Sequence, residues 1–142
     1  MAGSQSMSPR ASSSSKKKHF TLTEANRSLP LVKRIVADIV KTHEKAITLQ
    51  TKLESTPPLD QAPSESELER LMDRLQGFVD ELSVLGVELK DYSTGLVDFV
   101  GRHQGRDVYL CWKLGEDRIT SWHELHTGFA GRKSVNQLRE SD

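Results

Sequence analysis

The segment 122–132, whose sequence is WHELHTGFAGR, gathers the side chains most able to do chemistry. His123 and His126 carry imidazoles, and Glu124 places a carboxylate between them. Neutral imidazoles and a carboxylate are ordinary ligands for zinc, manganese or iron. The segment is therefore a candidate site for a divalent metal such as zinc.

The spacing of the two histidines counts against this interpretation. The sequence His-Glu-Leu-His lacks the three-residue gap that places two histidines on one face of a helix. In a strand, His123 and His126 would point to opposite faces, so only a bend at Leu125 would bring them together. Asp98 or Asp91 could complete the ligand set. The alternative is that His123 bonds to a backbone group while His126 lies in a solvated loop.

A second candidate site lies at the end of the same segment. Gly128 and Gly131 could let backbone amides face a small anion such as phosphate, and Arg132 would supply a charged pair of donors. The pattern lacks the lysine and the βαβ context of known phosphate loops. Glycines that allow positive φ around a buried Phe129 explain the same residues without a ligand.

Cys111 is the only cysteine and the candidate thiol nucleophile. His123 and Glu124 are its conceivable partners in such a site. A single cysteine on a strand is more often a small packed residue, unless its pKa is lowered. One cysteine excludes an intramolecular disulfide and a multi-cysteine zinc site, and this fits a reducing cytosol.

Two long helices are expected ahead of these residues. Thr21 and Glu24 form a capping-box pattern that predicts a helix start, and Pro30 predicts a kink or a helix that restarts there. The segment 55–63 holds three of the five prolines, so the helix should end near Glu54. Between these points apolar residues recur at steps of three and four, as in a coiled-coil seam. The seam comprises Leu29, Val32, Val36, Ile39, His43, Ala46, Gln50 and Leu53.

The second helix has two overlapping capping boxes, Ser64 with Glu67 and Ser66 with Glu69, and Gly86 is a natural stop. Its apolar positions again follow the helical period: Leu68, Leu71, Met72, Leu75, Phe78, Val79, Leu82 and Leu85. The short connection predicts an antiparallel hairpin. The first helix has an excess of basic residues and the second an excess of acidic residues, which favours their pairing.

Beyond Gly86 the apolar period changes to near two, which predicts strands. The segments 95–101 and 107–114 are rich in β-branched and aromatic residues, and they flank a glycine-containing turn at 103–105, so they should form a β-hairpin. A third antiparallel strand over 119–124 would deliver the candidate site. One face of the second strand should cover a core, with Val108, Leu110, Trp112 and Leu114.

Charge and composition give no bulk electrostatic reason to expect a nucleic acid or a membrane as partner, although local charged patches remain possible. Lysine plus arginine equals aspartate plus glutamate at 20 each, so no nucleic acid or anionic membrane is expected. No apolar run approaches the roughly 18 residues of a membrane span, and a cytoplasmic protein is expected. Residues 1–18 should be a disordered tail and 134–142 a flexible one. A single domain is expected over 19–133, with the helical hairpin over 19–86 and the sheet with its glycine-rich loop over 87–133.

Several stretches form a distinctive combination. They are FTLTEANRSLPLV near the N-terminus, ELSVLGVELKD in mid-chain, then GLVDF, GRDVYLCWKLGE and WHELHTGFAGR. The combination resembles the uncharacterised bacterial family catalogued as domain of unknown function 2203, over residues 20–133. The resemblance implies one folding unit found in bacteria, and because the family has no established activity it implies no catalytic residue.

The sequence as a whole predicts an α+β protein, a long antiparallel helical hairpin followed by an antiparallel sheet of about three strands. Further apolar residues widen the helical stripe, so we expect a homodimer in which two hairpins form a four-helix bundle. These residues are Ile35, Val40, Ile47, Met72 and Val79. Two functions remain open. One is a self-associating interaction or scaffold module that binds a protein partner, and the other is a metal- or small-anion-binding protein or enzyme with its site at 122–132.

Overall fold

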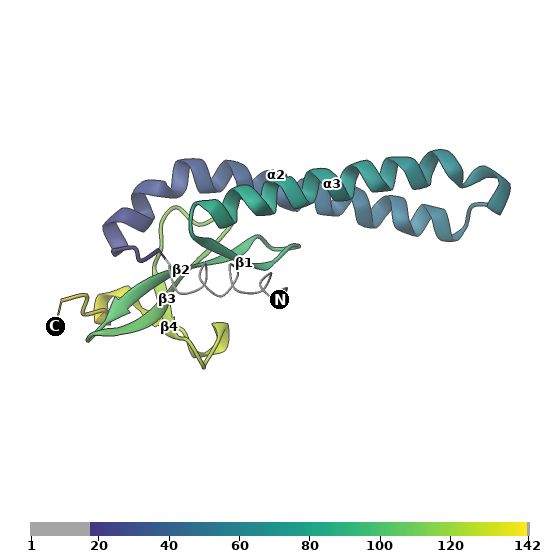
Figure 1. Ribbon diagram of the computed structural model, residues 1–142. Helices are drawn as coiled ribbons and strands as arrows, with labels where there is room; N and C mark the ends of the chain where they lie inside the picture. Colours follow the sequence, from purple (N-terminus) through teal and green to yellow (C-terminus); the bar gives the residue numbers. More distant parts are fainter. Residues whose placement is uncertain (1–17, 142) are drawn as a thin grey trace, which may run out of the picture.

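The computed structural model describes residues 18–141, which form two long helices followed by an antiparallel sheet (Figure 1). Helix α2 spans Leu22–Glu54 and helix α3 spans Ala62–Val84. The 3-10 turn η2, Pro58–Asp60, lies in the connection between them. The α+β class and the helical hairpin are thus confirmed.

Helix α2 begins at the predicted capping box. The Thr21 hydroxyl accepts from the Glu24 amide at 3.0 Å, and the Glu24 carboxylate accepts from the Thr21 amide at 2.9 Å. The predicted restart at Pro30 is wrong, because α2 continues through this residue. Leu29 and Val32 on its two sides are both buried in the same core, and this packing outweighs the one hydrogen bond that proline removes.

Helix α3 begins earlier than either predicted capping box. Its N-cap residue is Gln61, and Pro63 lies in the first turn, where an amide hydrogen has no partner within the helix. The helix ends at Val84, and Gly86 follows with a φ of +88°. The predicted stop at Gly86 is therefore confirmed, and it rests on a backbone conformation that glycine adopts without strain.

The sheet has five strands in the order β1-β2-β3-β4-β5, and every neighbouring pair is antiparallel. Gln104 and Gly105 form the turn of the predicted central hairpin, between β2 and β3. The count exceeds the predicted three, because short strands lie at both edges. The bounds are β1 Val87–Asp91, β2 Leu96–His103, β3 Arg106–Lys113, β4 Ser121–Glu124 and β5 Lys133–Ser134.

One face of the sheet packs against the helices and forms the core. The buried strand residues on this face are Val87, Val97, Phe99, Val108, Leu110, Trp112 and Trp122. They meet the first half of α2 and the last half of α3, while the loop end of the hairpin projects beyond the sheet (Figure 1). The predicted core face of β3 is confirmed. Burial of these apolar side chains supplies most of the stabilisation.

The C-terminal segment crosses the end of the sheet. The Arg139 amide donates to Nδ1 of His103 at 2.9 Å, and the Arg139 carbonyl accepts from the Gln104 amide at 2.8 Å. Part of the stretch for which the sequence predicts a flexible tail therefore has defined partners. The predicted N-terminal tail lies outside the described residues, apart from Lys18. No helix within residues 18–141 is long and apolar enough to cross a membrane.

Candidate metal centre

Three ionisable side chains meet on the face of the sheet that is turned away from the helical core. Asp98 lies on β2, Cys111 on β3 and His123 on β4. The register pairs Asp98 directly with Cys111, and it places His123 opposite Tyr109, two residues before Cys111. Because side chains alternate along a strand, the neighbours of these residues enter the core while the three share the opposite face.

The three side chains are close together and almost fully buried. The Cys111 sulfur lies 3.0 Å from Oδ1 of Asp98, and Nε2 of His123 lies 3.4 Å from Oδ2 of Asp98. The side chains of Asp98 and His123 are each only 4% exposed. Within residues 18–141, this is the one group of three such residues whose potential ligand atoms all lie within 4.8 Å of one another.

The hydrogen bonds show which nitrogen of His123 carries a proton. Nδ1 lies 2.7 Å from the backbone carbonyl of Glu124, and because a carbonyl only accepts, Nδ1 is the donor. In the neutral ring Nε2 then has a lone pair that faces the carboxyl group of Asp98. Two acceptors in this position need a proton or a cation between them. A histidine held through Nδ1 by a backbone carbonyl is also the usual arrangement of a metal ligand.

Burial controls the protonation of the other two groups. Burial raises the pKa of Asp98, although the hydrogen bond from Cys111 and the nearby His123 oppose this effect. Burial and the carboxylate of Asp98 together raise the pKa of the Cys111 thiol far above its usual range. The thiol donates to a carboxylate rather than to an imidazole base, so the geometry does not support an activated nucleophile. A cation would reverse both effects, since it stabilises the deprotonated forms.

A pocket of about 180 Å³ opens beside the three side chains. Lys90 and Tyr109 supply its other polar groups. The Lys90 ammonium lies 3.0 Å from Oε1 of Glu88, and the Tyr109 hydroxyl donates to the same oxygen at 3.0 Å. The remaining lining is largely apolar and comprises Leu96, Leu125, Gly128 and Phe129. Sequence reasoning did not assign Lys90 or Tyr109 to a site, although alternation along β3 puts Tyr109 on the face of Cys111.

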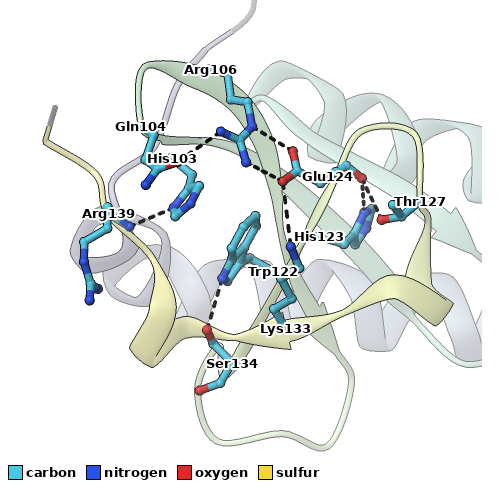
Figure 2. A network of polar contacts seen from close by, with 10 residues as sticks. All are labelled: His103, Gln104, Arg106, Trp122, His123, Glu124, Thr127, Lys133, Ser134 and Arg139. Carbon is cyan, nitrogen blue, oxygen red and sulfur yellow. Dashed lines mark hydrogen bonds and ion pairs between the residues drawn. The ribbon is translucent and has the colours of Figure 1, made fainter.

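The other predicted metal ligands lie elsewhere. Figure 2 shows that the Glu124 side chain points toward Arg106, away from His123. Its carboxylate accepts from Nε of Arg106 at 2.9 Å, and this hydrogen bond lowers the pKa of Glu124. His126 is exposed in the turn after β4, and Asp91 accepts from hydroxyl groups in the turn after β1. Only His123 and Asp98 of the predicted metal set come together, and Cys111 joins them.

The glycine-rich loop uses its own polar groups internally. The amides of Gly131 and Arg132 donate to the carbonyls of Gly128 and Phe129, at 3.0 and 3.2 Å. The Arg132 guanidinium lies 3.6 Å from the centre of the Phe129 ring, and this ring is exposed, not buried as the alternative interpretation expected. A Cβ on Gly131 would lie 2.5 Å from Cβ of Thr127, so this glycine permits a close approach within the loop. Of the predicted anion site, the amides of Gly131 and Arg132 are therefore already engaged within the loop.

Comparison with known proteins gives a family for this chain. Residues 18–135 match the family described as "Uncharacterized conserved protein (DUF2203)". The chain belongs to this family. The matched span includes Asp98, Cys111, His123 and the pocket beside them. No match was found among curated proteins or among solved structures. The family description assigns no activity.

Proposed function

We propose that this DUF2203 protein binds one divalent transition-metal ion, zinc by preference, through Asp98, Cys111 and His123. The observation that supports this is the convergence of a carboxylate, a thiol and an imidazole within 4.8 Å in a buried position. Three protein ligands leave a fourth coordination position free, and the pocket lies beside them. A metal with such a position supplies activated water or polarises a substrate oxygen.

The donor atoms suit zinc better than magnesium or calcium. Those two ions prefer ligand sets made only of oxygen, whereas zinc accepts sulfur, nitrogen and oxygen together. With bonds of about 2.3 Å to sulfur and about 2.0–2.2 Å to nitrogen and oxygen, a tetrahedral centre separates its ligands by roughly 3.3–3.6 Å. The 3.4 Å between Nε2 of His123 and Oδ2 of Asp98 falls in this range. The Cys111 sulfur lies 3.0 Å from the other oxygen, Oδ1, so the carboxyl group would have to turn to offer one oxygen at these separations from both neighbours.

Metal content after dialysis tests the proposal. Untagged protein is loaded with zinc, dialysed and analysed by mass spectrometry for zinc per chain. We expect one zinc in the wild type and much less in Asp98→Asn, Cys111→Ser and His123→Gln. Glu124→Gln and His126→Asn are matched controls, because they remove neighbouring donors that lie outside the cluster, and they should keep the wild-type content. Substoichiometric zinc in the wild type, or equal zinc in all variants, would exclude the proposal.

A second function, self-association through the helices, is favoured by apolar side chains exposed on the hairpin. Apart from Leu59 in the connection, four large ones are exposed on α2 and α3: Leu31, Ile47, Met72 and Val84. Leu31 and Val84, the latter 86% exposed, line a groove with other residues of α2 and α3. We propose that a second copy covers this surface and that two hairpins form a four-helix bundle, as in a homodimeric scaffold.

The molar mass in light scattering tests this second function. A dimer is expected at micromolar concentration, and Val84→Lys should shift the population toward the monomer because it puts a charge in the apolar groove. A strictly monomeric wild type would exclude self-association and leave the groove for a different protein partner.

We also propose that the protein acts in the cytoplasm. A metal-binding thiol has to stay reduced, and the cytosol maintains this condition for Cys111. Fractionation of cells that express the untagged protein would check the location, and recovery in an oxidising compartment would contradict it.

A further inference from the structure

The pocket beside the proposed metal is small and opens to solvent. Its volume is about 180 Å³. One part of its lining is polar, with Lys90 and Tyr109, and another part is apolar. A site with these walls suits a small molecule that has one charged end and one short apolar end.

Lys90 supplies a positive charge with free donors. Its ammonium lies 3.0 Å from Oε1 of Glu88 and 4.7 Å from the centre of the Tyr109 ring. An ammonium has three N–H donors, and Glu88 engages one of them, so others can reach a ligand in the pocket. Burial opposes the charge, but Glu88, Tyr109 and Asp98 together outweigh burial and raise the pKa of Lys90. Lys90 is therefore a cation at neutral pH.

The charges around the pocket favour a ligand with one negative charge. A divalent ion bound by a carboxylate, a thiolate and a neutral imidazole has no net charge of its own. Glu88 balances Lys90 through their ion pair. Arg132 stacks on Phe129, which lines the pocket, and adds one positive charge. None of the ion pairs found within residues 18–141 includes Arg132. A ligand with one negative charge cancels this excess positive charge.

The apolar wall indicates what the rest of the ligand looks like. Leu96, Leu125 and Phe129 line the pocket, and Leu125 and Phe129 are 45% and 37% exposed to solvent. A short aliphatic chain would cover these side chains and remove apolar surface from water. A compact dianion such as phosphate would bring more charge and no apolar group.

We infer that the pocket binds a small aliphatic monocarboxylate. The inference rests on the proposed metal site, since one carboxylate oxygen takes the free coordination position. The other oxygen accepts a hydrogen bond from Lys90. The aliphatic chain lies against the leucine side chains and Phe129. Specificity then comes from one metal bond, one charged hydrogen bond and a small apolar surface.

Cobalt-loaded protein provides the test. Cobalt(II) replaces zinc in sites of this kind, and its visible absorption changes when a ligand enters the coordination sphere. Butyrate should produce a saturable change, and inorganic phosphate should need a higher concentration. Lys90→Met should raise the dissociation constant of butyrate about tenfold, because a hydrogen bond to a charged group is lost. Lys133→Met, which removes the same charge from the opposite face of the sheet, should leave it unchanged.

The outcomes separate this inference from the proposed function. If cobalt fails to bind, the proposed metal site is wrong. If cobalt binds through the three ligands but butyrate leaves the spectrum unchanged, the metal site stands and the ligand class is wrong. Tighter binding of phosphate than of butyrate would also overturn the class. Equal butyrate affinity in Lys90→Met and the wild type would remove Lys90 from the site.

Discussion

Replacing Cys111 with serine should remove most of the stabilisation that zinc gives to the folded protein. In the wild type, free zinc at a hundredfold excess over its dissociation constant stabilises the folded state by about 2.7 kcal/mol. For a domain of this size each kcal/mol raises Tm by roughly 3–5 °C, so zinc should raise Tm by roughly 8–13 °C. A ligand lost from the first coordination shell weakens binding by about a hundredfold or more, because even outer-shell changes cost about 10- to 100-fold.

The same zinc concentration would then stabilise Cys111→Ser by only about 0.4 kcal/mol, a Tm shift of about 1–2 °C. The fold itself should be largely retained without metal, since the serine hydroxyl can still donate to Asp98 as the thiol does. Loss of that one hydrogen bond costs about 0.5–1.5 kcal/mol at most.

Thermal unfolding by circular dichroism, with and without buffered free zinc, measures the shift in Tm that zinc causes and the Tm of the metal-free protein. His126→Asn is the matched control, because it removes an exposed imidazole that lies outside the cluster and should keep the full zinc shift. Equal zinc shifts in Cys111→Ser and the wild type would refute the reasoning, as would a wild type that zinc does not stabilise.

Three further predictions concern contacts outside the centre. Glu124→Gln breaks the ion pair with Arg106, so it should slightly lower the urea concentration at the midpoint of unfolding. The zinc content should stay at one per chain, and a loss of zinc would contradict the placement of Glu124 outside the centre. Burial lowers the pKa of His103, and the positive charge of nearby Arg106 lowers it further. The unfolded chain therefore binds more protons than the folded one, so the free energy of unfolding should fall as pH drops through about 6.5. His103→Gln should flatten this fall, and equal slopes in the two proteins would count against it. Gly95→Ala should lower the free energy of unfolding by at least about 2 kcal/mol, because alanine resists the left-handed conformation and its Cβ would lie 2.8 Å from Cγ1 of Val36. A loss of less than about 1 kcal/mol, roughly half of this, would contradict the packing.

Most of the architecture could be predicted because its signals are local. The capping box at Thr21, the glycine at Gly86 and the turn before Arg106 each act within a few residues, and they agree with the structure. The restart predicted at Pro30 is wrong because the effect of a proline depends on tertiary packing, which holds both parts of α2 on one core. Strand β5 has only two residues and forms by backbone pairing with β4, so no side-chain pattern in the sequence predicts it.

The sequence allowed the residues of the candidate centre to be named, but it did not predict that they would lie together. Asp98, Cys111 and His123 are each recognisable as chemically capable, yet sequence reasoning divided them between a metal site and a thiol site. Their meeting depends on strand register. The two-residue turn at 104–105 would have paired Asp98 with Cys111 by counting back along the hairpin. The register of His123 follows a longer connection between β3 and β4, and no local signal sets it.

X-ray absorption of the zinc-loaded protein reports which atoms are bound to the metal. With Asp98, Cys111 and His123 as ligands, the spectrum should show one sulfur at about 2.3 Å and nitrogen or oxygen neighbours at about 2.0–2.2 Å. The sulfur contribution should disappear in Cys111→Ser. A spectrum of the wild type with only nitrogen and oxygen neighbours would contradict the proposed centre.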